Sequence, residues 1–224
     1  MTRNETIFYF ALGIINISSG LLDLEWLNYL SKPLLMISLF FFYFQKVKQN
    51  ITTSDKIMLV SLIFSCLGDT FLMFQGKNPQ FFLLGLGSFL VAQISYSGVF
   101  KPLGVTNYNK RFPFIVYGFL FVLLLSDKIP KGFMIPISAY ATAIMWMGIT
   151  AAERQTNQKS YRFILIGATL FIISDSLIAI NKFAFSIPLS GLWVMATYIA
   201  AQYLIVEGVL LGRICHVLKK RYKI

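Results

Sequence analysis

The sequence predicts an all-α, polytopic membrane protein with eight transmembrane helices in a single domain, residues 1–224. Three observations predict this class. Of the 224 residues, 57% are hydrophobic and only 13% are charged, whereas soluble domains carry about 25% charged residues. The mean hydropathy is +0.69. The apolar residues also gather in runs that approach the roughly 20 residues needed to cross a bilayer. A soluble enzyme, a disordered chain and a disulfide scaffold are therefore excluded.

Each predicted span is an apolar run bounded by short polar segments, which leave no room for a second, soluble domain. The first run lacks a small-residue cleavage site after it, so we expect a retained helix and not a signal peptide. The fifth run is short, so it should tilt less than the others or begin earlier. The predicted spans are 6–22, 29–45, 56–74, 81–100, 112–126, 132–151, 161–180 and 190–212.

The positive charges predict the orientation of these spans. If the N-terminus is inside, 15 of the 20 lysines and arginines fall on the inner side, where cytoplasmic loops carry their excess. We therefore expect an integral membrane protein with both termini cytoplasmic, located in the cytoplasmic membrane if the source is bacterial. The net charge of +11 then indicates attraction to anionic membrane lipids. It does not indicate nucleic-acid binding, because the basic residues lie between apolar runs and form no soluble basic face.

Two of the nine carboxylates stand out because they lie deep inside predicted spans. Asp69 and Asp175 would each cost about 2.5–3.5 kcal/mol to insert, so such residues usually face a cavity and mark function. Glu207 also lies in a span, but close enough to the basic tail to reach the interface or to pair with Arg213. The other six fall in loops or at span ends, where solvation is easy: Glu5, Asp23, Glu25, Asp55, Asp127 and Glu153.

The two aspartates occupy matching positions. Asp69 lies 13 residues after Lys56, and Asp175 lies 13 residues after Arg162. Both spans run from inside to outside, so the two carboxylates should lie at the same depth, roughly 20 Å from the inner surface at about 1.5 Å per residue. Small residues flank both acids. The simplest explanation is a parallel four-plus-four helix repeat, in which spans one to four resemble spans five to eight.

If both acids face one cavity, repulsion and desolvation oppose ionisation of both, so the pair should share one proton. Such a pair can perform general acid/base chemistry. It can equally serve a proton-coupled transporter of small molecules or lipids. The remaining alternative is that each aspartate only caps or hydrogen-bonds a neighbouring helix. A structural or lipid-scrambling scaffold of this kind would tolerate Asp to Asn changes at both positions.

The sequence offers no metal or cofactor site. His216 is the single histidine, and Cys66 and Cys215 are the two cysteines. A zinc hydrolase needs three or four such ligands, and a serine or cysteine nucleophile needs a histidine partner. We therefore expect no metal and no cofactor. Gly208 and Gly212 form a GxxxG pattern, which predicts a helix contact within the chain or in a homo-oligomer.

Lys32 precedes Pro33 at the predicted outer start of the second span. A proline suits the first turn of a helix, but a cation there is disfavoured by the helix dipole unless an anion lies near it. Lys32 would also lie at about the depth of the aspartates. It is either a partner for a phosphate or carboxylate in the site or a lysine that extends to the interface.

The motifs together resemble the YhhN-type lysoplasmalogenase family. They run from Lys32-Pro33-Leu34 through 68–73 and 82–96 to 174–183 and 198–205, so the resemblance covers roughly residues 30–208. It implies an eight-helix membrane hydrolase that cleaves the vinyl ether bond of lysoplasmalogens. The products are a fatty aldehyde and a glycerophospho-ethanolamine or -choline. The partners are then a lysophospholipid and water.

The resemblance also implies the site residues. The two motif aspartates of the family fall on Asp69 and Asp175, which become the expected catalytic residues. Many relatives carry histidine at position 93, so a proton-carrying role is in doubt for Gln93, and a hydrogen bond to substrate or water is the alternative. The implied substrate-binding residues are Lys32, Gln93, Tyr96, Asn181, Tyr198 and Gln202.

The implied reaction fits the residue types. A vinyl ether is hydrolysed by protonation of its β-carbon, addition of water to the resulting oxocarbenium ion, and collapse of the hemiacetal to an aldehyde. These steps need an acid, a negative charge near the cation and a base for the water. Asp69 and Asp175 could supply all three without a metal, and the sequence does not assign which aspartate is the acid.

Overall fold

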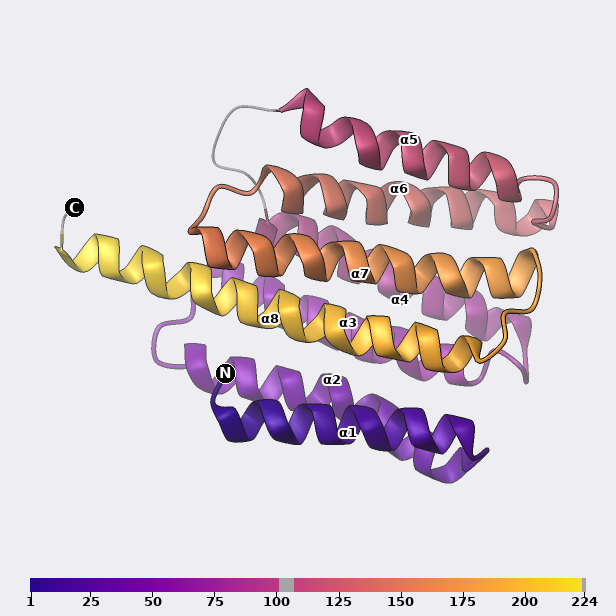
Figure 1. Ribbon diagram of the computed structural model, residues 1–224, viewed down its shortest axis with the longest axis horizontal. Helices are drawn as coiled ribbons and strands as arrows, with labels where there is room; N and C mark the ends of the chain where they lie inside the picture. Colours follow the sequence, from indigo (N-terminus) through magenta and orange to yellow (C-terminus); the bar gives the residue numbers. More distant parts are fainter. Residues whose placement is uncertain (101–106, 223–224) are drawn as a thin grey trace.

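The computed structural model describes residues 1–100 and 107–222, with side chains up to residue 213. Within these residues the backbone forms eight helices, which run side by side along the molecule (Figure 1). They are α1 (Arg3–Leu21), α2 (Glu25–Val47), α3 (Thr53–Met73), α4 (Pro79–Phe100), α5 (Tyr108–Leu125), α6 (Lys131–Glu153), α7 (Gln158–Phe183) and α8 (Ser190–Tyr222). The predicted all-α class and the number of helices are confirmed.

Seven of the helices form a closed ring. Going around it, α1 packs on α2, α2 on α3, α3 on α4, α4 on α6, α6 on α7, α7 on α8, and α8 on α1. Helix α5 lies outside the ring against α6, uppermost in Figure 1. It buries only Gly118 and Leu125. The interior of the ring is therefore bounded by seven helices, and α5 covers one side of it.

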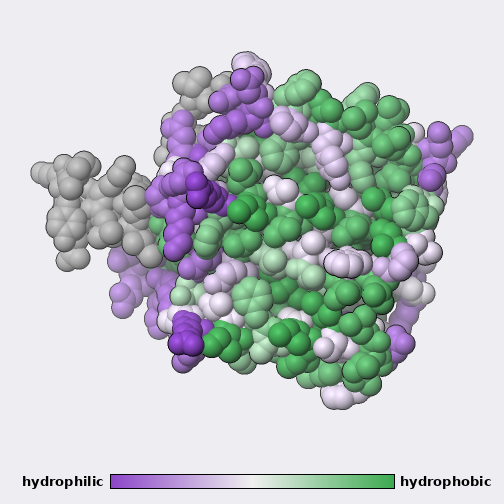
Figure 2. Space-filling view, viewed as in Figure 1, coloured by the Kyte–Doolittle hydropathy of each residue, from purple (hydrophilic) through white to green (hydrophobic). Residues whose placement is uncertain are grey.

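Seven helices, α2 to α8, are long and apolar enough to cross a membrane. The apolar residues form a broad belt between two polar ends (Figure 2), as a bilayer requires. Helix α1 is of similar length but is not among the seven, so its role as an eighth span stays a prediction. Helix α1 begins and α8 ends at the same end of the bundle (Figure 1); we call this the terminal end and the opposite one the far end. Which end faces the cytoplasm is still a prediction.

Most predicted span ends agree with the helix ends to within about one turn. The fifth span begins earlier than its apolar run, at Tyr108. Helix α2 begins at Glu25, so Pro33 lies inside the helix, and its predicted place in the first turn was wrong. A proline inside a membrane helix is tolerated where neighbouring groups satisfy the freed backbone. Helix α8 extends ten residues past the predicted span, to Tyr222.

The four-plus-four repeat stays a prediction. Consecutive helices pack on one another in both halves of the chain, as a repeat would require. The first helix of each half is placed differently, however. Helix α1 closes the ring against α8, whereas α5 lies outside it against α6.

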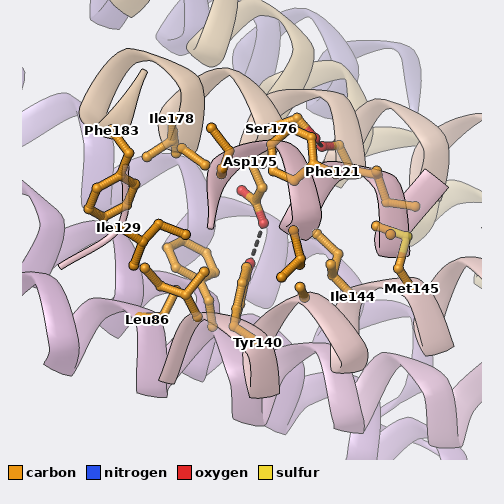
Figure 3. A pocket seen from close by; sticks show the side chains of 18 of the residues that line it. Leu86, Phe121, Ile129, Tyr140, Ile144, Met145, Asp175, Ser176, Ile178 and Phe183 are labelled. Carbon is orange, nitrogen blue, oxygen red and sulfur yellow. Dashed lines mark hydrogen bonds between the residues drawn. The ribbon is translucent and has the colours of Figure 1, made fainter. Parts of the chain in front are cut away.

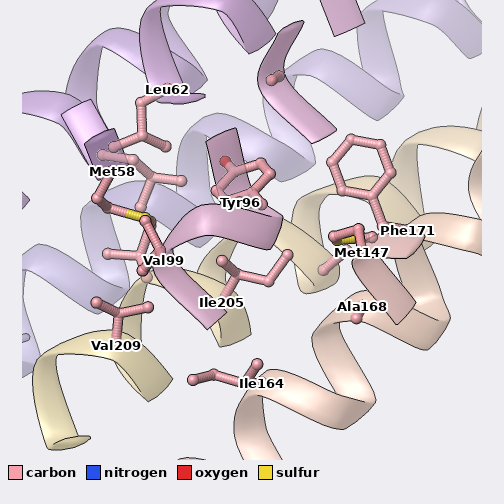
Figure 4. Packing of buried hydrophobic residues seen from close by; sticks show 14 of the residues in the cluster. Met58, Leu62, Tyr96, Val99, Met147, Ile164, Ala168, Phe171, Ile205 and Val209 are labelled. Atoms are coloured by element: carbon pink, nitrogen blue, oxygen red, sulfur yellow. The ribbon is translucent and has the colours of Figure 1, made fainter. Parts of the chain in front are cut away.

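The terminal half of the ring is filled by a packed hydrophobic core. Met58, Leu62, Met147 and Ile164 are fully buried there, and they interlock with side chains from α4 and α8 (Figure 4). Close packing of this kind leaves no continuous path through a protein interior. The open spaces of the site are therefore found toward the far end.

The GxxxG glycines lie in a contact within the chain. A Cβ added to Gly208 would lie 2.6 Å from Cγ1 of Ile164, and one added to Gly212 would lie 2.8 Å from the hydroxyl of Ser160. Both neighbours belong to α7, so the glycines allow α7 and α8 to approach closely. The intramolecular alternative is confirmed, and a homo-oligomer stays a prediction.

Two carboxylates expected to be easily solvated are instead buried at the terminal end. Asp55 is 2% exposed and completes a capping box with Thr52 at the start of α3. This position turns its carboxylate back over the helix end, where the Tyr43 hydroxyl (2.7 Å) and Arg213 (3.2 Å) bind it. The solvated placement was therefore wrong for Asp55, because α2 and α8 cover the start of α3.

Glu153 is the second of these carboxylates. It is 5% exposed, and Arg111 binds both of its oxygens, with Nε at 2.7 Å and Nη2 at 2.9 Å. This bidentate ion pair joins the last residue of α6 to the first turn of α5. A charge that is buried usually has such a partner, and neither partner could be foreseen from its own local sequence.

Glu207 does not pair with Arg213. Its carboxylate binds the amino group of Met1, and Arg213 binds Asp55 instead. Residues six apart on a helix point in different directions, so they cannot meet as residues three or four apart do. Glu207 thus ties α8 to the start of α1.

Candidate active site

Asp69 lies at one end of a chain of hydrogen bonds that joins three helices. The Tyr198 hydroxyl donates to Oδ2 of Asp69 at 2.6 Å. Nε2 of Gln202 donates to the hydroxyls of Tyr198 and Ser65, both at 3.2 Å. The Tyr96 hydroxyl donates to Oε1 of Gln202 at 2.6 Å. All five side chains are buried, so the structure brings Tyr96, Tyr198 and Gln202 together with Asp69.

The helix registers explain this convergence. Tyr198 and Gln202 are four residues apart on α8, and Ser65 and Asp69 are four apart on α3, so each pair lies on one helical face. Gly68 lets α4 approach α3 here, because a Cβ at this position would lie 2.6 Å from the ring of Phe89. That ring in turn packs edge-on against Tyr198, with centroids 6.1 Å apart. Packing thus holds the hydroxyl of Tyr198 toward Asp69.

Lys32 supplies a cation to this cluster. Its Nζ lies 3.9 Å from Oδ1 of Asp69, and its side chain is 17% exposed. The anion needed near Lys32 is therefore Asp69 itself. Lys32 also lines a polar pocket at the far end, which encloses about 1060 Å³ of empty space, part of it open to the surroundings. Other polar residues that line this pocket are Asn16, Asn28, Gln75, Asn181, Lys182 and Ser190.

Two polar residues of α7, Asn181 and Lys182, border the polar pocket. The Asn181 side chain accepts a hydrogen bond from the backbone of Ile187 at 2.8 Å, which anchors the turn before α8. Lys182 donates to Oε1 of Gln75 at 3.2 Å, and its Nζ lies 4.4 Å from the ring centroid of Phe82. Two lysines, Lys32 and Lys182, therefore border one pocket, which suits an anionic group.

Asp175 lies in a different environment. Its Oδ2 accepts a hydrogen bond from the Tyr140 hydroxyl (Figure 3). Both residues line an apolar pocket with about 780 Å³ of empty space. The rest of its lining is almost entirely hydrocarbon, contributed by α3 to α7 and the turn between α5 and α6, and includes Leu86, Phe121, Ile129 and Phe183 (Figure 3). No lysine or arginine is among its lining residues.

The two aspartates occupy adjoining sites, each with its own tyrosine. Within the described residues no hydrogen bond joins the two carboxylates, so proton sharing through a direct contact is not observed. Leu72 lines both the polar and the apolar pocket. Phe89 lines the apolar pocket and packs on Tyr198, the partner of Asp69. The polar and apolar sites are thus separated by a thin wall of side chains.

Gln93 is fully buried, yet neither polar atom of its amide has a hydrogen-bond partner among the described residues. It lies one turn before Tyr96 on α4. An unpaired buried amide costs about 1–3 kcal/mol, so such a group usually has a water or ligand partner. The hydrogen bond of Gln93 to water or substrate stays a prediction.

Tyr140 is one of the site residues that sequence reasoning missed, as is Lys182 of the polar pocket. Tyr140 is separated from Asp175 by 35 residues, so no local motif links the two. A weak signal does exist in its own helix, since Ile137, Tyr140, Ile144 and Met147 recur at helical spacing and are all buried. That spacing places the four residues on the face of α6 that points into the bundle, and Tyr140 is the one among them with a polar group.

No metal centre is apparent in the described part of the chain, where no three histidine, cysteine, aspartate or glutamate side chains lie close enough to hold an ion. The functional groups that the described side chains bring to the site are carboxylates, phenols, amides and the ammonium group of Lys32. This defines a class: a polytopic helical membrane protein with two carboxylates inside its helix bundle, a buried one beside a polar pocket and a partly buried one that lines an apolar pocket.

The chain belongs to the YhhN family, whose model matches residues 27–209. This confirms the resemblance drawn from the motifs. Among curated proteins, it is 33% identical over 155 residues to "Lysoplasmalogenase TMEM86A" of Bos taurus, covering 66% of this chain and 62% of that protein. It is 28% identical over 165 residues to "Lysoplasmalogenase TMEM86B" of Mus musculus, covering 70% of this chain and 65% of that protein. The chain thus matches less than two thirds of the length of these relatives, and no solved structure matches it significantly.

Proposed function

We propose that this protein hydrolyses the vinyl ether bond of lysoplasmalogens to a fatty aldehyde and a glycerophospho-ethanolamine or -choline. One observation carries the proposal. Two carboxylates, Asp69 buried and Asp175 partly buried, are each bound by a tyrosine hydroxyl and lie beside adjoining polar and apolar pockets. This arrangement suits a substrate that is itself half polar and half hydrocarbon. The names of the curated relatives support the same reaction.

The substrate would lie across the wall between the pockets. Its phosphate suits the polar pocket, where Lys32 and Lys182 offer positive charge. Its alkenyl chain suits the apolar pocket around Asp175. A vinyl ether joins the glycerol of the headgroup to the chain, so it would lie at the boundary, near both carboxylates. Binding of the two ends would hold the reacting carbons in place.

We assign the acid role to Asp175 and the base role to Asp69. The apolar pocket offers no cation to stabilise a negative charge on Asp175, which favours its protonated form. Each aspartate accepts a hydrogen bond from a tyrosine, but only Asp69 also has a cation, Lys32, that stabilises its carboxylate. Two carboxyl groups in unlike environments can take opposite roles in one reaction.

In the proposed reaction Asp175 donates its proton to the β-carbon of the vinyl ether, which forms an oxocarbenium ion. The carboxylate of Asp69 stabilises this cation and accepts a proton from the water that adds to the adjacent carbon. When the hemiacetal collapses, its hydroxyl proton returns to Asp175, and Asp69 gives its proton to the departing glycerol oxygen. One water is consumed, and both aspartates recover their starting forms.

The first test is chemical. Purified protein is mixed with a lysolipid that carries a vinyl ether, and separately with its saturated ether and ester counterparts. We expect aldehyde from the vinyl ether alone. In D₂O, aldehyde trapped at once by reduction should carry one deuterium on the carbon next to the former carbonyl, because that carbon receives the proton from Asp175. Absence of aldehyde refutes the proposed function.

The second test concerns the residues. Asp69→Asn and Asp175→Asn should each lower kcat by at least about 100-fold, the lower range for a general acid or base. Asp127→Asn, at an exposed loop position, is the matched control and should leave kcat unchanged. Full activity in both site variants would rule out the assigned chemistry even if aldehyde forms.

A proton-coupled transporter is the second candidate, and the two intramembrane carboxylates, of which Asp69 lies beside Lys32, favour it. A transporter must open its site to both sides of the membrane in turn. The densely packed terminal half of the ring (Figure 4) favours the hydrolase, because it closes the site on that side. Uptake into vesicles that depends on a pH gradient, without chemical change of the solute, would favour the transporter.

A further inference from the structure

A groove follows the surface between α5 and α6. Its lining is mostly apolar and includes Ile115, Phe119, Val122, Trp146 and Ile149. Several of these side chains are strongly exposed, with Phe119 at 67% and Trp146 at 49%. Because both helices are candidate spans, a groove of this composition would face the hydrocarbon of the bilayer.

The groove and the apolar pocket of Asp175 are two sides of one helix contact. Gly118, Val122, Ala141 and Met145 line both of them. At the centre of this shared wall, a Cβ on Gly118 would lie 2.6 Å from Cγ of Met145. The barrier between groove and pocket is therefore a glycine on one helix and a flexible methionine on the other. Methionine changes rotamer easily and fits irregular apolar partners.

Helix α5 has few buried contacts with the rest of the molecule beyond the ion pair between Arg111 at its start and Glu153 of α6. It lies outside the ring and packs mainly on α6. Among the described residues, a hydrogen bond between the hydroxyls of Tyr117 and Ser176, at 2.8 Å, ties the middle of α5 to α7. Ser176 directly follows Asp175, so this bond closes the side wall of the pocket next to the carboxylate. An element with few buried contacts opens more readily than the core.

We infer that the α5–α6 groove is a lateral portal through which the hydrocarbon chain of a lipid passes between the bilayer and the apolar pocket. The inference rests on the proposed function, since it takes the pocket as the site of the chain. The occupant is a hydrocarbon chain because groove and pocket are continuous through four shared residues and both are lined by apolar side chains. A long chain extends through the portal into the bilayer, and the aldehyde product leaves by the same route.

The portal is tested with a lipid that binds but is not cleaved. The probe is a saturated alkyl-ether lysolipid with a photoreactive diazirine near the end of its chain, incorporated with the protein into phosphatidylcholine vesicles. We expect adducts on α5 and α6 at the portal, with Met145 and Phe119 prominent, and loss of these adducts with excess unlabelled lysolipid. Adducts that excess lysolipid does not displace, or that it displaces only from other helices, overturn the portal.

Matched glycine variants test the constriction. Gly118→Leu fills it, whereas Gly87→Leu places the same side chain in open space on α4, where no atom lies within 4 Å of an added Cβ. We expect Gly118→Leu to lower displaceable labelling about tenfold and Gly87→Leu to leave it unchanged. Met145→Ala widens the constriction and should raise labelling. If Gly118→Leu does not fold, as judged by its elution and thermal midpoint, Met145→Ala decides, and unchanged labelling in that variant overturns the portal.

Activity measurements on two substrates distinguish a blocked portal from damage to the active site in Gly118→Leu. Gly118→Leu should raise the KM for a long-chain vinyl ether lysolipid far more than the KM for a short, water-soluble vinyl ether that does not need the portal. Equal loss on both substrates overturns the portal. Displaceable labelling at α5 and α6 without any aldehyde production would refute the proposed function and leave the portal standing. Aldehyde production together with displaceable labelling only on helices other than α5 and α6 would refute the portal and leave the proposed function standing.

Discussion

The hydrogen bond from Tyr198 to Asp69 offers the sharpest single test of the site. Tyr198→Phe removes one oxygen from a buried side chain and keeps the ring that packs on Phe89. The change deletes the 2.6 Å bond to Oδ2 of Asp69 and the 3.2 Å bond from Gln202. The carboxylate keeps its ion pair with Lys32 at 3.9 Å. The substitution therefore removes a hydrogen bond from the Asp69 carboxylate but leaves Lys32 as its cationic partner.

The expected loss of activity in Tyr198→Phe follows from the strength of a hydrogen bond to a charged carboxylate. A hydrogen bond to a charged group contributes about 1.5–3 kcal/mol, and about 1.4 kcal/mol corresponds to a factor of ten. If Asp69 acts as a carboxylate while the cation forms, most of this energy applies in the transition state. We therefore expect kcat/KM to fall roughly 10- to 150-fold. The fall should appear in kcat with little change in KM, because the hydroxyl stabilises Asp69 and does not hold the headgroup.

The assay is aldehyde release from a vinyl ether lysolipid over a range of substrate concentrations, with thermal unfolding measured in parallel. Tyr203→Phe is the matched control, because Tyr203 lies on the same helix and its hydroxyl bonds Thr6 at 3.1 Å, away from the site. It should keep normal kcat. An unchanged kcat in Tyr198→Phe, or an equal fall in the two variants, would refute the role given to this bond.

Three further predictions concern neighbouring residues. Lys32→Gln should raise the KM about tenfold or more for a lysolipid with a phosphate headgroup, and much less for an alkenyl glycerol without phosphate. Aldehyde release measures both KM values, and an equal rise for the two substrates would contradict headgroup binding by Lys32. Gly68→Ala should lower the free energy of unfolding by about 1–3 kcal/mol, because its Cβ would meet the ring of Phe89 at 2.6 Å, and denaturation of Gly87→Ala provides the unaffected comparison. Gln93→Met should lower kcat without lowering the thermal midpoint, because it removes a buried amide that has no protein partner; a large loss of stability would show that the amide is structural.

Much of the fold followed from the sequence. Hydropathy depends on each residue and its near neighbours, so the apolar runs located the helices to within about one turn at most ends. The same scarcity of charge made Asp69 and Asp175 conspicuous, because a buried carboxylate is costly wherever its helix packs. The predictions of solvated carboxylates were wrong where a residue distant in the sequence lowers the cost of burying the carboxylate. Asp55 and Glu153 looked like solvated span ends, but Arg213 and Arg111 allow them to be buried.

The sequence by itself determined that this chain forms membrane helices and that two of these helices carry an aspartate well inside them, since helix length and hydrophobicity are local properties. Only the tertiary structure decided that α5 lies outside the ring, that Tyr140 binds Asp175, and that Tyr198 binds Asp69. It also gave the aspartates unlike surroundings, a cation beside Asp69 and hydrocarbon around Asp175. The order in which helices pack depends on the fit of many side chains across helix contacts. No single stretch of sequence contains that information.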